Sequence, residues 1–223
     1  MTEILILAEL EGGVLHSSAG ELLAAGRKLG DEMGADVSAA VLGESTDDAA
    51  REAIILGADH VYTASHPILT EGLADGQIAA LEQICAETSP LAILTAKTPL
   101  GRSVGPRLAY RLDSGVAQDC MDVTGDNTTG RITVTRPVYG GNAMAKFTFA
   151  DNNPQVVVLR VKAFEPLEPN PERSGDVKSI EVTIDDSQIK AKLVETVKEE
   201  SEGVKLEDAG VIIGGGRGLG GPE

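Results

Sequence analysis

The chain has 223 residues, of which 42% are hydrophobic, so it can bury a core in one large or two small domains. A formal net charge of −16, with three Phe, three Tyr and no Trp, excludes a basic or base-stacking surface for nucleic acid. No apolar run approaches the roughly 20 residues that cross a bilayer, and no signal-peptide-like segment opens the chain, so we expect a cytoplasmic protein that does not span a membrane.

Strands and helices alternate through the first hundred residues. Ser18 and Glu21 have the spacing of a capping box for the first helix, which should end before Gly34. Strands are expected at residues 3–10, 36–42, 60–64 and 91–96, and helices at residues 18–33, 45–57 and 75–90. This alternation implies right-handed crossovers and a mainly parallel sheet, so the predicted fold is a three-layer α/β sandwich of Rossmann-like or adenine-nucleotide-hydrolase-like type.

The segment that follows the fourth strand, residues 97–112, predicts another helix. Ser103 is its expected cap, which would place Pro106 in the first turn, where proline is tolerated. Gly101, Arg102 and Ser103 then lie beyond the carboxyl end of a strand, where open α/β sheets bind ligands. Three arginines make this region basic, namely Arg102, Arg107 and Arg111. It is either a contact for an anion, a cofactor edge or another subunit, or an ordinary loop with solvated arginines.

From residue 116 the pattern changes to hairpins. Apolar residues alternate on both sides of the turn-forming residues 139–142, and residues 154–161 predict a buried strand. A connector rich in proline and acidic residues follows at 165–176. The alternation in residues 179–184 and 192–198 predicts an antiparallel ribbon at an edge of the main sheet, and residues 204–210 predict a helical turn.

Few side chains suggest catalysis or metal binding. Cys85 and Cys120 lie far apart and match no metal or redox spacing, so we expect buried free thiols. Three histidines are scattered, and His16, after the first strand, is expected on a surface loop. Asp119 and Asp122 are interpreted as charges at a strand end. No catalytic residue and no metal site are predicted.

The last thirteen residues are "VIIGGGRGLGGPE". Their apolar start predicts a short strand, and Gly216, Gly218 and Gly221 fit G-x-G-x-x-G, the spacing of a loop that brings backbone N–H groups against a pyrophosphate. Such a loop normally opens a helix, which does not follow here.

Four segments resemble the alpha subunit of electron transfer flavoproteins. They are "GRSVGPRLAYRLDSGVAQDC", "TRPVYGGNAMAKF", "VVVLRVKAF" and "EDAGVIIGGGRGLGGPE", in this order and at these separations. The match covers the whole chain. The combination of G-R-x-x-x-P-R, R-P-x-Y-G-G-N-A and G-G-R-G is specific, whereas the glycine loop alone would be weak evidence.

The resemblance implies two domains. The first, at residues 1–203, would be an α/β platform that pairs with a similar domain of the beta subunit. The second, at residues 204–223, would be the first strand and glycine-rich loop of the domain that holds most of the FAD. The family's later FAD motifs have no counterpart here, so the chain is expected to be truncated and not to retain FAD tightly by itself.

Four residues near the end are carried over as cofactor-binding. Arg217 matches the family's arginine that contacts FAD, and its guanidinium suits a pyrophosphate or a flavin edge. Gly215, Gly216 and Gly218 match the loop around it, where a side chain would hinder close approach of the backbone.

The implied function is electron carriage rather than enzymatic catalysis. FAD would accept electrons from an acyl-CoA or related dehydrogenase, as in fatty acid beta-oxidation, and pass them to a quinone reductase or another acceptor. The expected partners are the beta subunit, in a heterodimer, and these redox proteins; in a eukaryote the location would be the mitochondrial matrix. A bifurcating complex is possible under the same resemblance, and two alternatives stay open: a stand-alone adenine-nucleotide-binding module, and a dimerisation scaffold without its own ligand.

Overall fold

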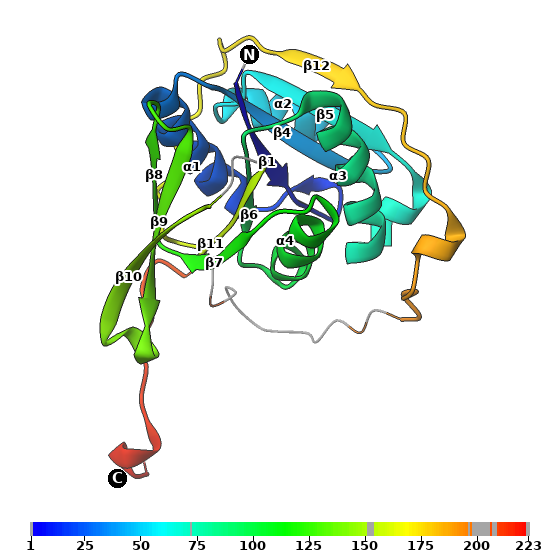
Figure 1. Cartoon of the computed structure of the whole chain (residues 1–223). Helices are drawn as coiled ribbons and strands as arrows, with labels where there is room; N and C mark the ends of the chain where they lie inside the picture. Colours follow the sequence, from blue (N-terminus) through cyan, green and yellow to red (C-terminus); the bar gives the residue numbers. More distant parts are fainter. Residues whose placement is uncertain are drawn as a thin grey trace. The chain divides into compact units, whose positions relative to one another are not determined.

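A seven-stranded sheet, in which every neighbouring pair of strands is parallel, forms the centre of residues 1–192 (Figure 1). The computed structural model describes residues 2–71, 73–150, 154–195, 197, 206 and 209–221. The strand order is β12-β5-β4-β1-β6-β11-β7. These strands are β1 (Glu3–Ala8), β4 (Asp36–Gly43), β5 (His60–Ser65), β6 (Ala92–Ala96), β7 (Val116–Cys120), β11 (Gln155–Leu159) and β12 (Asp176–Ser179).

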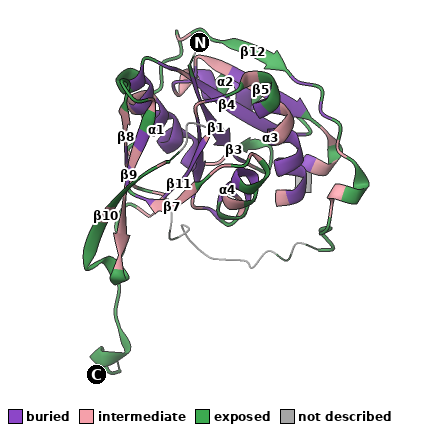
Figure 2. Cartoon of the chain, viewed as in Figure 1, coloured by how far each residue is buried: buried purple, intermediate pink, exposed green. Residues whose placement is uncertain are grey.

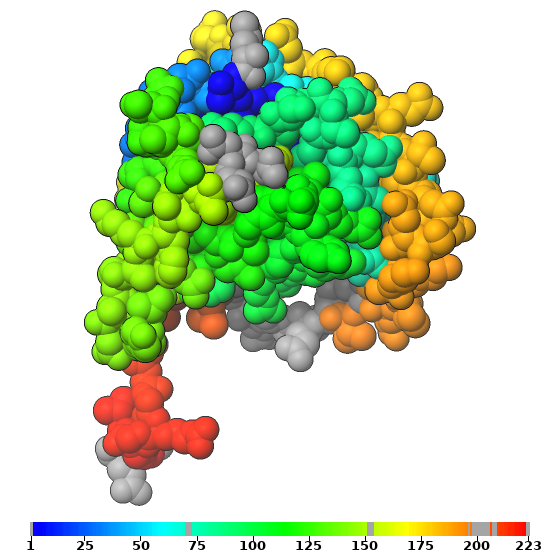
Figure 3. All heavy atoms as spheres, in the orientation of Figure 1, coloured from blue at the N-terminus to red at the C-terminus, as the bar shows by residue number. Residues whose placement is uncertain are grey.

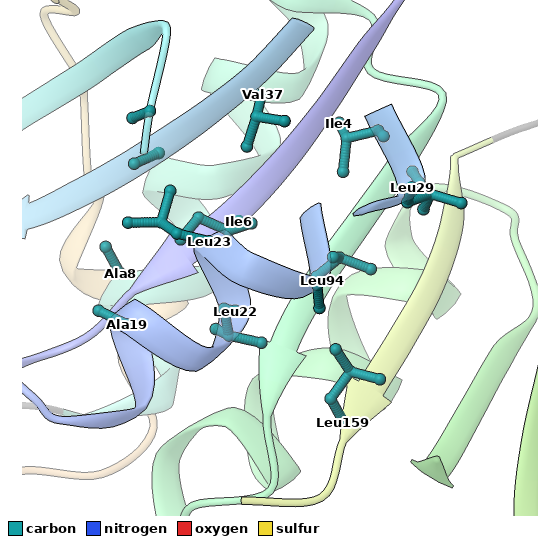
Figure 4. Packing of buried hydrophobic residues seen from close by; sticks show 14 of the residues in the cluster. Ile4, Ile6, Ala8, Ala19, Leu22, Leu23, Leu29, Val37, Leu94 and Leu159 are labelled. Carbon is teal, nitrogen blue, oxygen red and sulfur yellow. The ribbon is translucent and has the colours of Figure 1, made fainter. Parts of the chain in front are cut away.

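Helices cover both faces of this sheet because its strands alternate their apolar side chains between two cores. On one face, Ile4 and Ile6 of β1 pack with α1 and α2 (Figure 4). On the other, Leu5 and Leu7 pack with α3 and α4. The helices are α1 (Ser18–Met33), α2 (Asp47–Ile55), α3 (Ala74–Thr88) and α4 (Pro99–Arg111). The predicted three-layer α/β sandwich is confirmed, and Figure 2 shows its central strands buried and the edge strand β12 exposed.

An antiparallel sheet of three strands packs beside α1, in the order β10-β9-β8. These strands are β8 (Asp122–Asp126), β9 (Arg131–Val138) and β10 (Ala143–Thr148), and a two-stranded ribbon joins β2 (Leu10–Glu11) to β3 (Val14–Leu15). The amide of Gln155 on β11 accepts from Ile132 N at 2.8 Å and donates to Gly130 O at 3.0 Å. Because Gln155 is fully buried, these bonds tie the hairpin to the parallel sheet.

The edge of the main sheet differs from the predicted antiparallel ribbon. Strand β12 is a single strand that runs parallel to β5. Ile180 and Val182, which follow β12 in the chain, are buried. The chain then passes α3 (Figure 3), where Thr183 and Gln83 exchange two hydrogen bonds of 2.9 Å. Residues 192–195 and 197 form no strand. The antiparallel prediction was wrong because alternation in a sequence does not encode the direction of the neighbouring strand.

Helix α4 begins five residues earlier than Ser103 would have placed it. Thr98 is the cap, and its hydroxyl accepts from Gly101 N at 2.9 Å, while Pro99 takes the first helical position that suits proline. The predicted Ser103 cap was wrong. Pro106 consequently lies inside the helix, where it removes one backbone hydrogen bond.

Residues 193–223 form a second unit. The expected strand at 211–213 is not formed: Val211 and Ile213 are 83% and 96% exposed, and no strand pairs with them in the part of the chain that the structure describes. The predicted turn at 204–210 falls largely outside the described residues, as does the proposed domain boundary near residue 203, which stays a prediction. Among the described helices, none has the length and apolar character needed to cross a bilayer.

Candidate functional site

The point where the strand order reverses is where open α/β sheets usually bind ligands. From β1, the chain adds β4 and β5 on one side and then β6, β7 and β11 on the other, so the switch lies between β1 and β6. Glu9 follows β1, and Thr98 lies two residues after β6, at the start of α4. The contact between these two side chains determines which ligands the switch point can bind.

Glu9 itself occupies the switch point. Its side chain is buried, and the Thr98 hydroxyl lies 2.7 and 2.8 Å from the two carboxylate oxygens. Burial raises the pKa of Glu9 above its ordinary value, which the Thr98 hydrogen bond partly offsets. An internal carboxylate therefore stands beside the positive end of α4, where an anionic ligand would otherwise bind. This arrangement argues against an anion contact at Gly101 and against the nucleotide-module alternative.

Two of the three arginines of α4 are engaged with α3 rather than with a site. Arg107 pairs with Asp75, which is 5% exposed, and Arg111 lies 3.0 Å from Glu82. Asp75 also accepts from the backbone N–H groups of Lys190 and Ala191, and the Arg107 guanidinium lowers the pKa of Asp75. Arg102 and Ser103 are exposed on the first turns of α4.

His16 helps to begin helix α1 in place of the predicted capping box. Its Nδ1 accepts from Ser18 N at 3.2 Å and lies 2.8 Å from Ser18 Oγ. Glu21, the other half of the predicted box, instead accepts from Lys162 N at 2.5 Å. The capping box was therefore wrong, because a distant backbone donor takes up the carboxylate.

A three-residue ion cluster joins the carboxyl ends of β6, β11 and β7. Arg160 donates Nε and an Nη to the two carboxylate oxygens of Asp119, both at 2.8 Å, and Lys97 Nζ lies 2.8 Å from Asp119 Oδ1. The register with β11 shifts so that Asp119 is bulged out, with φ +62°. The Arg160 guanidinium and then Lys97 hold the pKa of Asp119 well below its usual range, against the opposing effect of partial burial. The sequence pattern indicates only a strand-end charge at Asp119 and misses this cluster.

The cluster should make folding sensitive to acid. Since the pKa of Asp119 is lower in the folded chain, its stabilisation is fully present above the unfolded value of about 3.9 and is lost as the pH falls through the folded pKa. We expect Asp119→Asn to reduce the free energy of unfolding by about 1–2 kcal/mol at neutral pH, allowing for partial exposure. Urea unfolding from pH 7 to pH 3 should show this difference shrinking below about pH 4. A difference that does not vary with pH would contradict the assignment.

The other candidates from the sequence are structural. Cys85 and Cys120 are buried free thiols, as predicted, and burial raises their pKa values to about 12 and about 11. Asp122 lies 2.6 Å from Lys28 of α1. No group of three or more histidine, cysteine or acidic residues suited to a metal is found in the described part of the chain.

The glycine loop belongs to the second unit and is described by itself. Arg217–Leu219 form a 3-10 turn, and Gly215, Gly216, Arg217 and Gly218 are all exposed. A Cβ added at Gly216 or Gly218 would meet nothing within 4 Å, so a ligand could approach the backbone there. No carboxylate lies within ion-pair distance of Arg217 among the described residues. Accessible backbone N–H groups beside an exposed guanidinium fit the phosphates of a dinucleotide such as FAD.

Comparisons of this sequence with a protein-family model and with known proteins all indicate the same family. A model described as the electron transfer flavoprotein domain matches residues 4–185. The electron transfer flavoprotein subunit alpha of Thermoanaerobacterium thermosaccharolyticum is 35% identical over 221 residues, covering 99% of this chain and 67% of the relative. That of Megasphaera elsdenii is also 35% identical, covering 97% of this chain and 64% of the relative.

A further relative has a more specific name. It is the lactate dehydrogenase (NAD(+),ferredoxin) subunit LctC of Acetobacterium woodii, 31% identical over 213 residues. The alignment covers 93% of this chain and 49% of that relative. This chain thus spans about two thirds of the first two relatives and half of this one.

Proposed function

The chain belongs to the electron transfer flavoprotein family, and on that premise we propose that it is an alpha subunit that carries electrons by means of FAD. The observation that most supports a cofactor contact within this chain is the exposed glycine loop with Arg217, which pairs with no carboxylate among the described residues. FAD, when bound, supplies the acceptance and release of electrons. Arg217 would hold its phosphates or flavin edge by charge-assisted hydrogen bonds, and Gly215, Gly216 and Gly218 would let the backbone approach.

Residues 1–192 would contribute a platform rather than a second ligand site at the sheet's switch point. Glu9 already places a carboxylate at that point, in contact with Thr98 at the start of α4, where its negative charge would repel an anion. We propose that this platform pairs with the beta subunit. The domain boundary near residue 203 is part of the same proposal.

The redox partners would be an acyl-CoA or related dehydrogenase and an acceptor such as a quinone reductase, in the cytoplasm. A second candidate is a role in an electron-bifurcating complex. The name of the LctC relative favours it, because it joins a dehydrogenase with NAD+ and ferredoxin.

The test is to purify the protein from its source with whatever polypeptide accompanies it and to record the visible absorption spectrum. A flavin band in the blue, together with a second subunit of similar size, is the expected result. A colourless preparation without a second polypeptide would contradict the carrier role. Reduction of the flavin by acyl-CoA plus its dehydrogenase, compared with reduction by NADH plus ferredoxin, would separate the simple carrier from the bifurcating candidate.

A further inference from the structure

A second feature of residues 1–192 has the properties of a ligand site. A pocket of about 470 Å³ lies between the β9–β10 turn and the carboxyl ends of β7 and β11. That volume falls within the range of small-molecule sites. Six of its lining residues can contact a ligand or shape the turn: Asp119, Arg136, Tyr139, Gly140, Gly141 and Arg160. None of them belongs to the glycine loop, so binding at this pocket is independent of the proposed FAD contact.

The pocket is cationic on an acidic protein. Arg136 and Arg160 line it, and Lys97 adjoins it through Asp119, whose single negative charge is shared between Lys97 and Arg160. Three cations against one anion leave an excess of positive charge, although the whole chain carries −16. Such a local concentration favours an anionic ligand, because the surrounding negative charge would repel an anion elsewhere.

Both arginines retain donors for a ligand. Arg160 uses Nε and one Nη for Asp119, while its other Nη lies 3.7 Å from Met121 Sδ, a weak acceptor. The Nε of Arg136 is buried and has no hydrogen-bond partner in the structure as described, and its guanidinium lies 5.9 Å from the Phe147 ring centre. No hydrogen bond from either Nη of Arg136 is found among the described residues, so these two atoms can donate to a ligand in the pocket.

The turn gives the pocket an aromatic rim. Tyr139, Gly140 and Gly141 all have positive φ, of 51°, 68° and 94°, so the two glycines are needed for the turn to close. Tyr139 is left 84% exposed at the pocket, although its ring is large and apolar. A planar ring of a ligand could stack on it while its phosphate meets the arginines.

We propose that this pocket binds a phosphate-bearing small molecule, held by Arg136 and Arg160. The shared chemistry is the phosphate group, which could come from a free inorganic phosphate or from a nucleotide. The residues concerned are those of the R-P-x-Y-G-G-N-A segment together with the ends of two strands that only the fold brings to it.

The test is isothermal titration of the 223-residue chain with inorganic pyrophosphate and, separately, with AMP at low salt. We expect one site, an affinity that falls as salt rises, and at least a tenfold loss in Arg136→Ala. Arg131→Ala is the matched control, because Arg131 begins the same strand and is exposed, and its side chain hydrogen-bonds only to Ala150 O in the described structure. If AMP binds more tightly than pyrophosphate and Tyr139→Ala removes this difference, the ligand is a nucleotide. If AMP binds no more tightly than pyrophosphate, the ligand is an inorganic phosphate.

A measurement on the unaltered chain protects the test against a variant that fails to fold. Amide shifts in a ¹⁵N–¹H spectrum on adding pyrophosphate should cluster at Gly140, Gly141 and Arg160. Shifts confined to residues 214–221, absence of binding at millimolar pyrophosphate, or equal losses in Arg136→Ala and Arg131→Ala would each overturn the proposal. If the pocket proposal fails, the proposed FAD contact of Arg217 is not affected, because the two proposals concern different residues. Consistent with this, Arg217→Ala should not change pyrophosphate binding at the pocket.

Discussion

Gly101→Ala is expected to lower the free energy of unfolding by about 3 kcal/mol or more. A Cβ at this position would lie 2.2 Å from the backbone oxygen of Ala96 and 2.8 Å from Glu9 Oε1. Neither neighbour can move easily, since Ala96 ends a central strand and Glu9 is held by Thr98. The added methyl group would therefore displace both the start of α4 and the residues at the switch point of the sheet.

Urea unfolding of the wild-type chain, Gly101→Ala and a matched variant would measure this. Gly20→Ala is suitable, because Gly20 also lies in a helix but an added Cβ would meet only Pro166 of the surface connector, at 3.1 Å. We expect Gly20→Ala to stay within about 1 kcal/mol of the wild type, since alanine favours a helix over glycine. Equal stabilities of the two variants would refute the close packing described at Gly101.

Arg217→Ala is expected to weaken FAD retention about 10- to 150-fold in the flavin-loaded complex with the accompanying subunit. The loss of a charge-assisted hydrogen bond of about 1.5–3 kcal/mol corresponds to that factor. The measurement is flavin content per heterodimer after dialysis, with the reduction potential alongside it. Arg217→Lys should recover only part of the affinity, because an ammonium cannot donate in the planar, forked geometry of a guanidinium.

The matched control for this prediction is Arg102→Ala. Arg102 is likewise exposed, but it lies on α4 next to the switch point that Glu9 fills. Flavin content should be unchanged in this variant. Unchanged flavin content and potential in Arg217→Ala would reject the carry-over of this residue from the family while leaving the family assignment intact.

The strands and helices of the first hundred residues could be predicted because each depends on local periodicity. Alternating apolar residues in β1 face two cores, and the helical spacing of α1 places Leu22, Leu23 and Leu29 against one of them (Figure 4). The helix caps could not be predicted in the same way. Several residues near each helix start can serve as a cap, and distant partners decide among them, as when Lys162 N takes Glu21 away from the predicted box.

The strand expected at residues 211–213 shows the same limit. Three consecutive apolar residues indicate a buried strand, but a strand exists only with a neighbour that accepts its backbone hydrogen bonds, and none pairs with these residues among those described. The glycine loop and Arg217 were recognised from residue type and spacing alone. Their role in binding FAD remains a prediction.

The sequence alone determined the α/β class, the order of the elements in the first hundred residues, the burial of both cysteines and the family, because these follow from hydrophobic periodicity and from motifs that lie close together in the chain. Only the tertiary structure decided how polar side chains are used. Glu9 reaches Thr98, and Asp119 meets Lys97 and Arg160, because the order of the strands brings their carboxyl ends together. Ion pairs and buried hydrogen bonds depend on the distance between two side chains in the folded protein, and the spacing of the residues along the chain does not give that distance.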